Sequence, residues 1–150
     1  MAPEIWTVGY ERLPPDALVA ELEAAGIERL IDVRFRAQSR RAGMSKTKLG
    51  LLLGEHRIAY EHRRDLGTPP DIRSDYKGGR VAAGHARMEQ HVEEEEAPSA
   101  ALDLLAEELA GGEAPRTVLM CLEADPAVCH RRVLVERLAE RLPGLVVHDL

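Results

Sequence analysis

Apolar residues occur along this chain in two alternating patterns. Short apolar runs rich in Val, Ile and Leu predict buried strands over residues 5–8, 30–33, 58–60, 118–121 and 145–147. Between them, apolar residues recur every three or four positions and predict helices over residues 14–25, from Ser45 as N-cap through Leu53, and over 99–109 and 126–142. Strands therefore alternate with helices along most of the chain.

This order predicts the fold class. Both of the first two strands are apolar throughout, which is typical of a parallel sheet covered on both faces. We expect a single α/β domain over residues 1–150, built as a three-layer sandwich around a mostly parallel sheet of about five strands, Rossmann-like or flavodoxin-like. Residues 65–79 are rich in Gly, Pro and Asp and predict an irregular loop, and residues 80–92 are weakly helical with no assignable packing.

Composition narrows the classes of function. The 150 residues are 45% apolar but only 3% aromatic, which argues against aromatic stacking platforms for single-stranded nucleic acid. The net charge of −6 argues against a uniformly basic coat. Neither a signal peptide nor an apolar run long enough to span a bilayer is recognisable, so we expect a cytoplasmic protein with no membrane partner.

Charge is unevenly distributed, however. Residues 34–48 contain six basic side chains and no acidic one, whereas residues 93–96 are four consecutive glutamates. The basic stretch is either a solvated loop or a surface that faces an anion.

Arg131 is the most informative single residue. In the last predicted helix it shares one stripe with Ala127, Leu134, Leu138 and Leu142, which places it on the side facing the sheet. A guanidinium cannot lose its proton, so burying it requires an anion close by. Asp32, inside an apolar strand, is the obvious internal partner, and the two either form a structural ion pair or make the floor of a pocket.

Polar residues around the predicted ends of these strands complete the candidate site. If Asp32 and Arg131 form its floor, the expected rim consists of Arg34, Ser39, Arg40, Glu123 and His130. His148, which ends the last strand at the same edge, is a secondary candidate.

Both cysteines of the chain belong to this region. Cys121 ends a strand and is either a small core residue or a nucleophile. Cys129 falls in the first turn of the predicted helix, where the helix dipole favours a thiolate, and its helical phase points away from the apolar stripe. A reversible Cys121–Cys129 disulfide is conceivable in geometry but is not favoured in a cytoplasmic protein.

Other chemistries fit the sequence less well. A cysteine-phosphatase loop would need an arginine at position 127, which is alanine. Zinc could bind Cys121, Cys129 and His130, but no CxxC spacing is present and a fourth ligand would have to come from elsewhere, so we expect no metal site and no cofactor. Walker and GxGxxG loops are missing, which disfavours ATPase and dinucleotide-binding activities.

The same residues resemble a known family, the bacterial and archaeal domain of unknown function numbered 488. The resemblance extends over nearly the whole chain but departs from the family pattern at Ala37, often a proline, and at Thr68, often a glycine. It implies an α/β fold and a cytoplasmic setting, and it supplies no reaction. The segments that carry it are Thr7–Tyr10, Ile31–Arg34 with Ser39–Arg40, Ile58 with Tyr60, Leu66–Gly67, and Cys121–Pro126 with Cys129–Arg131.

Three functional hypotheses remain open. In the first, an enzyme holds a phosphate-bearing or other anionic ligand, a nucleotide or nucleic acid, at the carboxyl edge of the sheet. Its charge would be bound by Arg34, Arg40 and Arg131, with Glu123 or His130 as acid or base and Cys121 or Cys129 as nucleophile. In the second, a non-catalytic module binds nucleic acid through residues 34–48. In the third, Cys121, Cys129 and His130 serve in redox chemistry or bind a metal.

Overall fold

A five-stranded, all-parallel sheet forms the centre of the computed structural model, which describes residues 2–150. The strand order is β3-β2-β4-β1-β5, and every neighbouring pair is parallel. The fourth strand along the chain, β4, therefore lies between β1 and β2. The strands are β1 (Glu4–Gly9), β2 (Arg29–Asp32), β3 (Ala59–His62), β4 (Thr117–Cys121) and β5 (Val146–Asp149).

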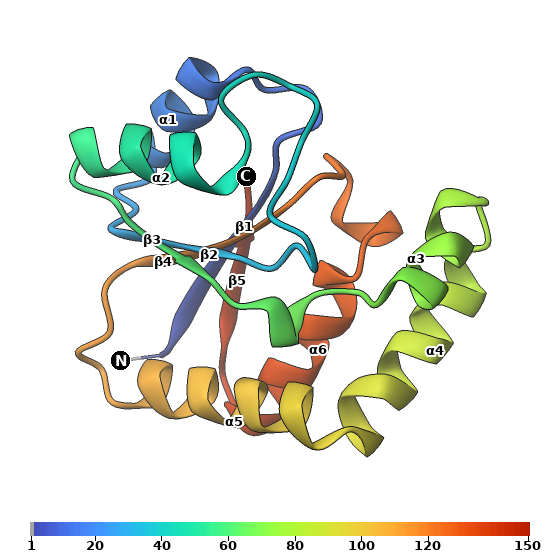
Figure 1. Ribbon diagram of the computed structural model, residues 1–150. Helices are drawn as coiled ribbons and strands as arrows, with labels where there is room; N and C mark the ends of the chain where they lie inside the picture. Colours follow the sequence, from blue (N-terminus) through green and yellow to red (C-terminus); the bar gives the residue numbers. More distant parts are fainter. Residues whose placement is uncertain (1) are drawn as a thin grey trace.

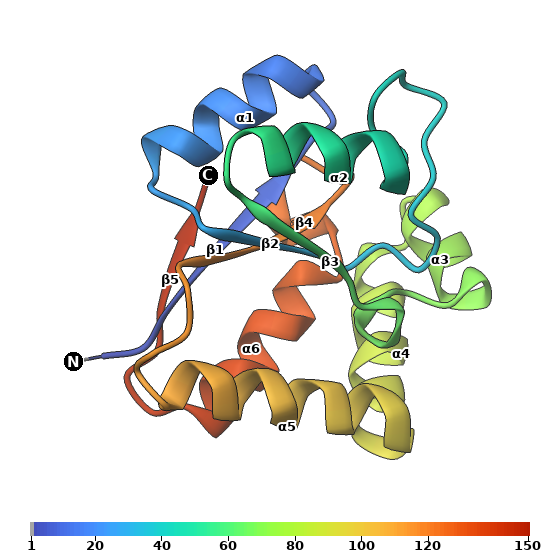
Figure 2. The ribbon, with the colours of Figure 1, turned by 60° about the vertical axis from the view of Figure 1, so that its left-hand side comes forward.

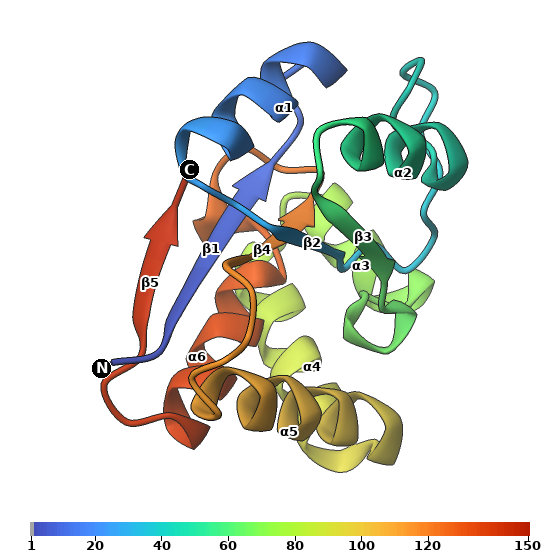
Figure 3. The same cartoon turned by 90° about the vertical axis from the view of Figure 1, so that its left-hand side faces the viewer.

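Helices cover both faces of the sheet (Figures 1 and 2). On one face lie α1 (Pro15–Ala24) and α2 (Lys46–Glu55), and on the other lie α5 (Glu96–Ala110) and α6 (Arg131–Arg141). A helical pair, α3 (Pro70–Lys77) and α4 (Val81–Glu94), packs beside α5 and α6. The three layers are clearest along the sheet in Figure 3. The predicted three-layer α/β fold with a parallel sheet is confirmed.

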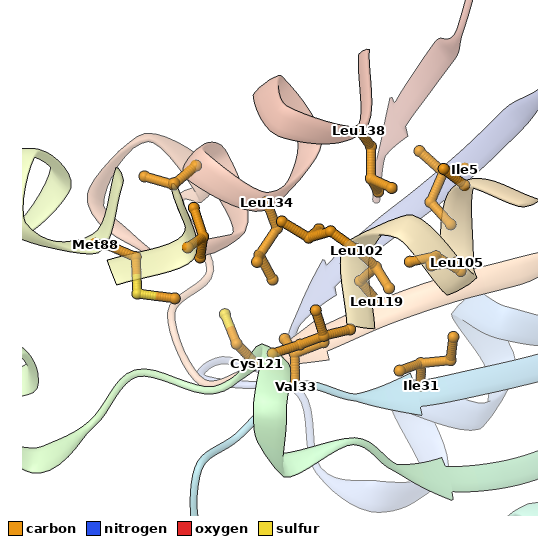
Figure 4. Close-up of a cluster of buried hydrophobic side chains, with 14 of the residues drawn as sticks. Ile5, Ile31, Val33, Met88, Leu102, Leu105, Leu119, Cys121, Leu134 and Leu138 are labelled. Carbon is orange, nitrogen blue, oxygen red and sulfur yellow. The ribbon is translucent and has the colours of Figure 1, made fainter. Parts of the chain in front are cut away.

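Two apolar clusters follow from the alternation of side chains along each strand. Trp6, Val8, Leu30, Val118 and Met120 point toward α1 and α2. The intervening residues Ile5, Ile31, Val33, Leu119 and Cys121 point toward α4, α5 and α6. Figure 4 shows Cys121 within this second cluster, which also contains Met88, Leu102, Leu134 and Leu138. Cys121 is thus a core residue as well as a strand end.

The carboxyl ends of the three central strands meet at one edge. Asp32 pairs in register with Met120, and Gly9 pairs with Cys121, so β1, β4 and β2 end side by side. Open parallel sheets bind ligands at this edge, where the connections depart to opposite faces. It is the edge that the sequence predicted for a site.

The predicted irregular loop at 65–79 is wrong in its central part. A short 3-10 turn at Arg64–Leu66 is followed by the two-turn helix α3. Pro70 occupies the first helical position, where its fixed φ is favourable, and Asp71 lies in the positive first turn. Gly78 follows the last helical residue, so the Gly and Pro residues bound a helix and do not exclude one.

The predicted helix over 126–142 is also divided. Asp125 accepts a hydrogen bond from the Ala127 amide and caps only a 3-10 turn, Pro126–Val128. Cys129 then has an extended backbone, with φ −130° and ψ 154°, and α6 begins at Arg131. Cys129 is therefore not in the first turn of a helix, and the extended residue turns its side chain inward, where it is buried.

Two helix starts differ in detail. Ser45 occupies the N-cap position of α2, but its hydroxyl accepts from the Ser39 amide at 3.0 Å instead of capping the helix. The helix expected from Ser99 begins at Glu96. Among residues 2–150, no helix combines the length and apolar character needed to cross a membrane.

Candidate functional site

Asp32 and Arg34 form a closed buried network at the end of β2. The guanidinium binds the carboxylate side-on, with Nη2 at 2.7 Å from Oδ2 and Nε at 2.9 Å from Oδ1. Tyr60 donates its hydroxyl to Asp32 Oδ2 at 2.5 Å, and Arg34 also donates to the Met44 carbonyl and to the Tyr10 hydroxyl. Burial alone would lower the pKa of Arg34, but the bond to Asp32 outweighs it and the pKa is raised. The negative charge of Asp32 is thus balanced by the positive charge of Arg34, two residues further along the chain.

The predicted pairing of Asp32 with Arg131 is therefore wrong. The backbone amide and the guanidinium of Arg34 donate hydrogen bonds to both carboxylate oxygens of Asp32. Within residues 2–150, Asp32 therefore makes no hydrogen bond to α6. The prediction overlooked Arg34 as the partner because it placed that residue on the rim of the pocket.

Arg131 itself is fully buried, as its helical phase predicted, with 0% of its surface exposed. Its guanidinium donates to Cys121 Sγ at 3.0 Å, Thr7 Oγ1 at 2.8 Å and the Glu123 carbonyl at 2.6 Å. No carboxylate within the described chain forms an ion pair with it. The Asp149 carboxylate is linked to Arg131 indirectly: the Thr7 hydroxyl accepts a hydrogen bond from the guanidinium and donates one to Asp149.

Gly9 makes this arrangement possible. A Cβ at position 9 would lie 1.7 Å from the Glu123 carbonyl oxygen, so only glycine lets the β4–α6 connection approach β1 closely enough for that carbonyl to accept from Arg131. Tyr10 and Glu11 then donate their amides to Cys121 and Leu122, which fixes the start of the connection.

The two cysteine sulfurs meet beside this guanidinium. Cys121 Sγ and Cys129 Sγ are 2.6 Å apart, both residues are 1% exposed, and both thiols are free. The Arg131 amide points at Cys129 Sγ at 3.5 Å, and the Arg131 side chain binds Cys121. Since neither Thr7 nor the backbone carbonyls carry charge, the thiols are the ionisable groups in direct contact with the buried cation.

Electrostatics favour a thiolate on Cys129. Burial would raise its pKa, but the hydrogen bond from Cys121 and the charge of His130 outweigh burial and hold the pKa of Cys129 well below its ordinary value of 9.0. Burial, followed by the bond to Cys129 and the charge on it, raises the pKa of Cys121 well above that value. The surroundings therefore favour the charged form on Cys129 over the charged form on Cys121.

His130 faces the sulfur of Cys129. Its Nε2 lies 2.9 Å from the Val33 carbonyl, an acceptor, so Nε2 carries a proton and Nδ1, 3.5 Å from Cys129 Sγ, faces the thiol. Burial would lower the pKa of His130, but the charge on Cys129 outweighs it and the pKa is raised. A cysteine facing a histidine that a third group orients is the arrangement of an activated nucleophile.

Glu123 lies beside the thiols without pairing with Arg131. Its Oε2 is 3.5 Å from Cys121 Sγ, and burial, followed by the charge of Cys129, raises the pKa of this carboxyl. Cys121, Glu123 and Cys129 place three potential metal ligands within 4.8 Å of one another. The guanidinium bound to Cys121 opposes a divalent cation there, so this donor set suits a metal poorly.

A cleft of about 700 Å³ opens at the same edge of the sheet. Arg34, Ser39 and Arg40, predicted for the rim, all line it, and Leu122 connects it with the β4–α6 segment that carries Glu123. The opposite wall comes from α3, in the segment that the sequence left as a loop. Its side chains in the cleft include Arg73, Ser74 and Lys77, and Thr68 lies just before the helix.

Four cations of this cleft lack partners, whereas Arg34 in its floor is paired with Asp32. No hydrogen bond or ion pair within residues 2–150 involves the side chains of Arg36, Arg40, Arg73 or Lys77. Among the described residues no carboxylate lines the cleft, and the buried Thr68 hydroxyl has no partner there. Arg73 and Lys77 were missed by sequence reasoning, although Pro70 followed by Asp71 is a signal for a helix start that would have placed them on one element.

His85 braces the site, whereas His148 lies away from it. His85 on α4 bonds the Tyr76 hydroxyl at 2.8 Å and the Ala127 carbonyl at 2.9 Å, and so ties α3 and α4 to the 3-10 turn before Cys129. His148, the secondary candidate, instead stacks on Trp6 with ring centroids 4.6 Å apart and bonds Glu4, near the start of β1. The structure does not bring His148 to the cysteines.

Comparison with known proteins gives one match. The family model described as "Domain of unknown function DUF488" matches residues 14–138, which is most of the chain. The chain belongs to the DUF488 family. The matched DUF488 span contains the Asp32–Arg34 network, the lining of the cleft and both cysteines, whereas Thr7–Tyr10 lies before it. No curated protein and no solved structure matches the chain.

Proposed function

We propose that the protein is an enzyme that binds a phosphate-bearing small molecule in the cleft between the segment after β2 and α3. The observation that carries this proposal is the lining, where Arg36, Arg40, Arg73 and Lys77 have no protein partner and no carboxylate offsets them. In a chain of net charge −6, four unpaired cations around one hollow create a local positive potential that attracts anions.

The roles within the cleft follow from charge. Arg34 is neutralised by Asp32, so it shapes the floor and holds the segment after β2 in place. Arg40, in the segment after β2, and Arg73, on α3, both line the cleft, and guanidinium groups on two segments suit recognition of phosphate oxygens, to which they donate in a bidentate manner. Ser39 and Ser74 add hydroxyl donors.

Catalytic groups lie next to this cleft. Leu122 lines it and Glu123 follows directly, with Cys129 and His130 behind. The charge of Arg73 acts on Glu123 and lowers its pKa against the larger effects of burial and Cys129, which raise it. In the proposed reaction Glu123, whose pKa is raised by burial, acts as the general acid toward the bound anion, and phosphate esters or nucleotides are the substrate class.

Isothermal titration with inorganic pyrophosphate and with adenosine monophosphate tests the binding step. We expect Arg40→Gln and Arg73→Gln each to weaken binding about tenfold, on the scale of one charge-assisted hydrogen bond. Arg141→Gln is the matched control, because it makes the same charge change at the far end of α6, where Arg141 pairs with Asp103. Absence of binding by the unaltered protein, or equal loss in the Arg141 variant, overturns the proposal.

A second candidate function is supported by the neighbouring hollow. A more open depression of about 620 Å³ shares Arg36 and Arg40 with the cleft and continues to Lys46, Lys48 and Arg64. A continuous basic surface of this kind fits the backbone of a nucleic acid. The logarithm of the affinity for a labelled oligonucleotide should then fall steeply and linearly with the logarithm of the salt concentration. The affinity for a small phosphate ligand should depend much less on salt.

A further inference from the structure

We propose that Cys121 and Cys129 form a dithiol redox couple in which Cys129 reduces a small hydroperoxide and Cys121 closes the disulfide. The couple rests on the juxtaposition of two buried sulfurs, a histidine and an arginine, and not on the phosphate cleft. It therefore stands or falls separately from the proposed ligand.

The geometry suits a reversible disulfide. The sulfurs already lie 2.6 Å apart, between β4 and the extended residue before α6, so a bond between them requires little movement of the backbone. Both cysteines belong to one connection of the chain that the Tyr76–His85–Ala127 contacts and the Glu123 carbonyl hold in place. A core cysteine placed only for packing needs no such partner.

The two sulfurs differ in their surroundings, which gives them different roles. Cys129 faces the imidazole of His130 and the amide of Arg131, both of which stabilise a thiolate, the form of cysteine that attacks. Cys121 remains the proton donor, next to the Arg131 guanidinium. Cys129 is thus the attacking residue and Cys121 the resolving one.

The reaction balances with a hydroperoxide as the oxidant. The Cys129 thiolate attacks one peroxide oxygen, the O–O bond breaks, and the departing alkoxide or hydroxide takes the proton of the His130 imidazolium. Cys129 is then a sulfenic acid. The Cys121 sulfur attacks the Cys129 sulfur, the S–O bond breaks, and water leaves with the Cys121 proton. Two cysteines are oxidised to a disulfide, one peroxide is reduced to an alcohol or water, and a small thiol regenerates the dithiol.

Burial selects the size of the oxidant. Both cysteines are only 1% exposed, and neither lines the cleft. A bulky disulfide substrate must approach the attacked sulfur in line, which the packing around Cys129 prevents, whereas hydrogen peroxide is close to water in size. The site is therefore expected to prefer hydrogen peroxide over glutathione disulfide.

The test uses the reduced full-length protein and one equivalent of hydrogen peroxide, followed by non-reducing peptide mapping. We expect a Cys121–Cys129 disulfide that dithiothreitol reverses, formed at least about tenfold faster than oxidation of the same thiols in the urea-unfolded protein, because the contacts with His130 and the Arg131 amide favour the attacking thiolate. Glutathione disulfide at equal concentration should react more slowly than the peroxide.

Matched variants assign the two roles. Cys121→Ser should stop at a sulfenic acid on Cys129, seen by mass spectrometry as the addition of one oxygen, while Cys129→Ser should lose the fast reaction. If either variant fails to fold, the order of events is read from the unaltered protein, in which acid quenching at short times followed by peptide mapping should find the added oxygen on Cys129 and not on Cys121. Oxygen added first at Cys121, or a native rate no faster than the unfolded one, overturns the redox couple and leaves pyrophosphate binding untouched.

Discussion

Two arginines are buried at neighbouring strand ends, and their charges are balanced in different ways. Arg34 donates hydrogen bonds to both oxygens of the Asp32 carboxylate, and the Tyr60 hydroxyl and the Met44 carbonyl complete the network. Arg131 instead binds a thiol, a hydroxyl and a backbone carbonyl. A carboxylate is ionised at any ordinary pH, whereas a thiol ionises only when its surroundings favour it. The charge of the first arginine is therefore balanced at any ordinary pH, whereas the charge of the second is balanced only if a neighbouring thiol ionises.

The comparison also separates neighbouring electrostatic environments. Within residues 2–150 the cleft is lined by cations and by no carboxylate, while the cysteine site next to it places a thiol of lowered pKa between Arg131 and His130. The cleft is open to a ligand from outside, and the cysteine site is closed to all but a small one. One edge of the sheet can thus hold an external anion and an internal one.

Removing Asp32 should cause the largest loss of stability. Asp32→Ala leaves Arg34 buried and charged, because a guanidinium cannot release its proton, and we expect the free energy of unfolding to fall by about 3–5 kcal/mol. Urea unfolding measures it. The double variant with Arg34→Met should lose less than the sum of the two single variants, and an additive result would show that the pair does not interact.

Removing Arg131 should cost less stability and more reactivity. In Arg131→Met the dithiol can take up a proton and become neutral, so only the unmade hydrogen bonds are lost, about 1–3 kcal/mol. The pKa of Cys129 should rise, because the two sulfurs and the guanidinium stabilise each other's charges. The thiolate absorbance of the reduced protein at near-neutral pH is expected to fall as the pKa of Cys129 rises. A stability loss as large as that of Asp32→Ala, with unchanged thiolate absorbance, contradicts the comparison.

Glu123→Gln distinguishes a thiolate from a carboxylate as the counter-charge of Arg131. Because burial and Cys129 raise the pKa of Glu123 above its ordinary 4.5, the native state keeps a proton that the unfolded state has released, and this contribution to stability is lost as pH rises through the folded pKa. The Gln variant lacks this loss. Relative to the unaltered protein, its free energy of unfolding should increase as pH rises above 4.5, by at most about 1.4 kcal/mol per pH unit, and then level off.

The opposite slope would identify Glu123 as the partner of Arg131. A carboxylate paired with that cation would have a lowered pKa, so it would stabilise the native state above pH 4.5. The free energy of unfolding of the Gln variant, relative to the unaltered protein, would then decrease as pH rises through this range. Urea unfolding of both proteins from acid to neutral pH decides between the two.

The smallest stability effect belongs to the cleft. Arg40 is exposed and has no partner within the described residues, so Arg40→Gln should change the free energy of unfolding by less than about 0.5 kcal/mol while weakening pyrophosphate binding. A matched change in thermal midpoint and in binding would show that the side chain acts on the fold and not on the ligand.

Much of the fold could be predicted because strand and helix periods are visible in the sequence. Apolar runs located all five strands, and the phase of the last helix correctly buried Arg131. The partners of Arg131 could not be predicted from the helical phase. The expected partner, Asp32, is bound instead by Arg34, which follows it by only two residues. The sulfur contact depends on one extended residue, Cys129, which the run of helix signals from Asp125 and Pro126 concealed.

The cleft was predicted by half. Ser39 and Arg40 follow a strand end and were expected at the rim, where the structure places them. Its other wall comes from α3, a helix of two turns whose apolar pattern is too short to recognise, with Ile72 its one buried residue. Short helices held by tertiary contacts carry little periodic signal, so the apolar pattern did not locate Arg73 and Lys77, and only the start signal of Pro70 and Asp71 pointed to a helix there.

Titration of the thiolate absorbance in the ultraviolet tests most directly whether a buried arginine is balanced by ionised sulfur. In the reduced native protein we expect the signal of one thiolate per chain at neutral pH, persisting as acid is added until the lowered pKa of Cys129 is passed, while the urea-unfolded protein shows none below the ordinary range. A native protein whose thiolate signal appears only as pH rises toward 9.0, as in the unfolded chain, would contradict the account.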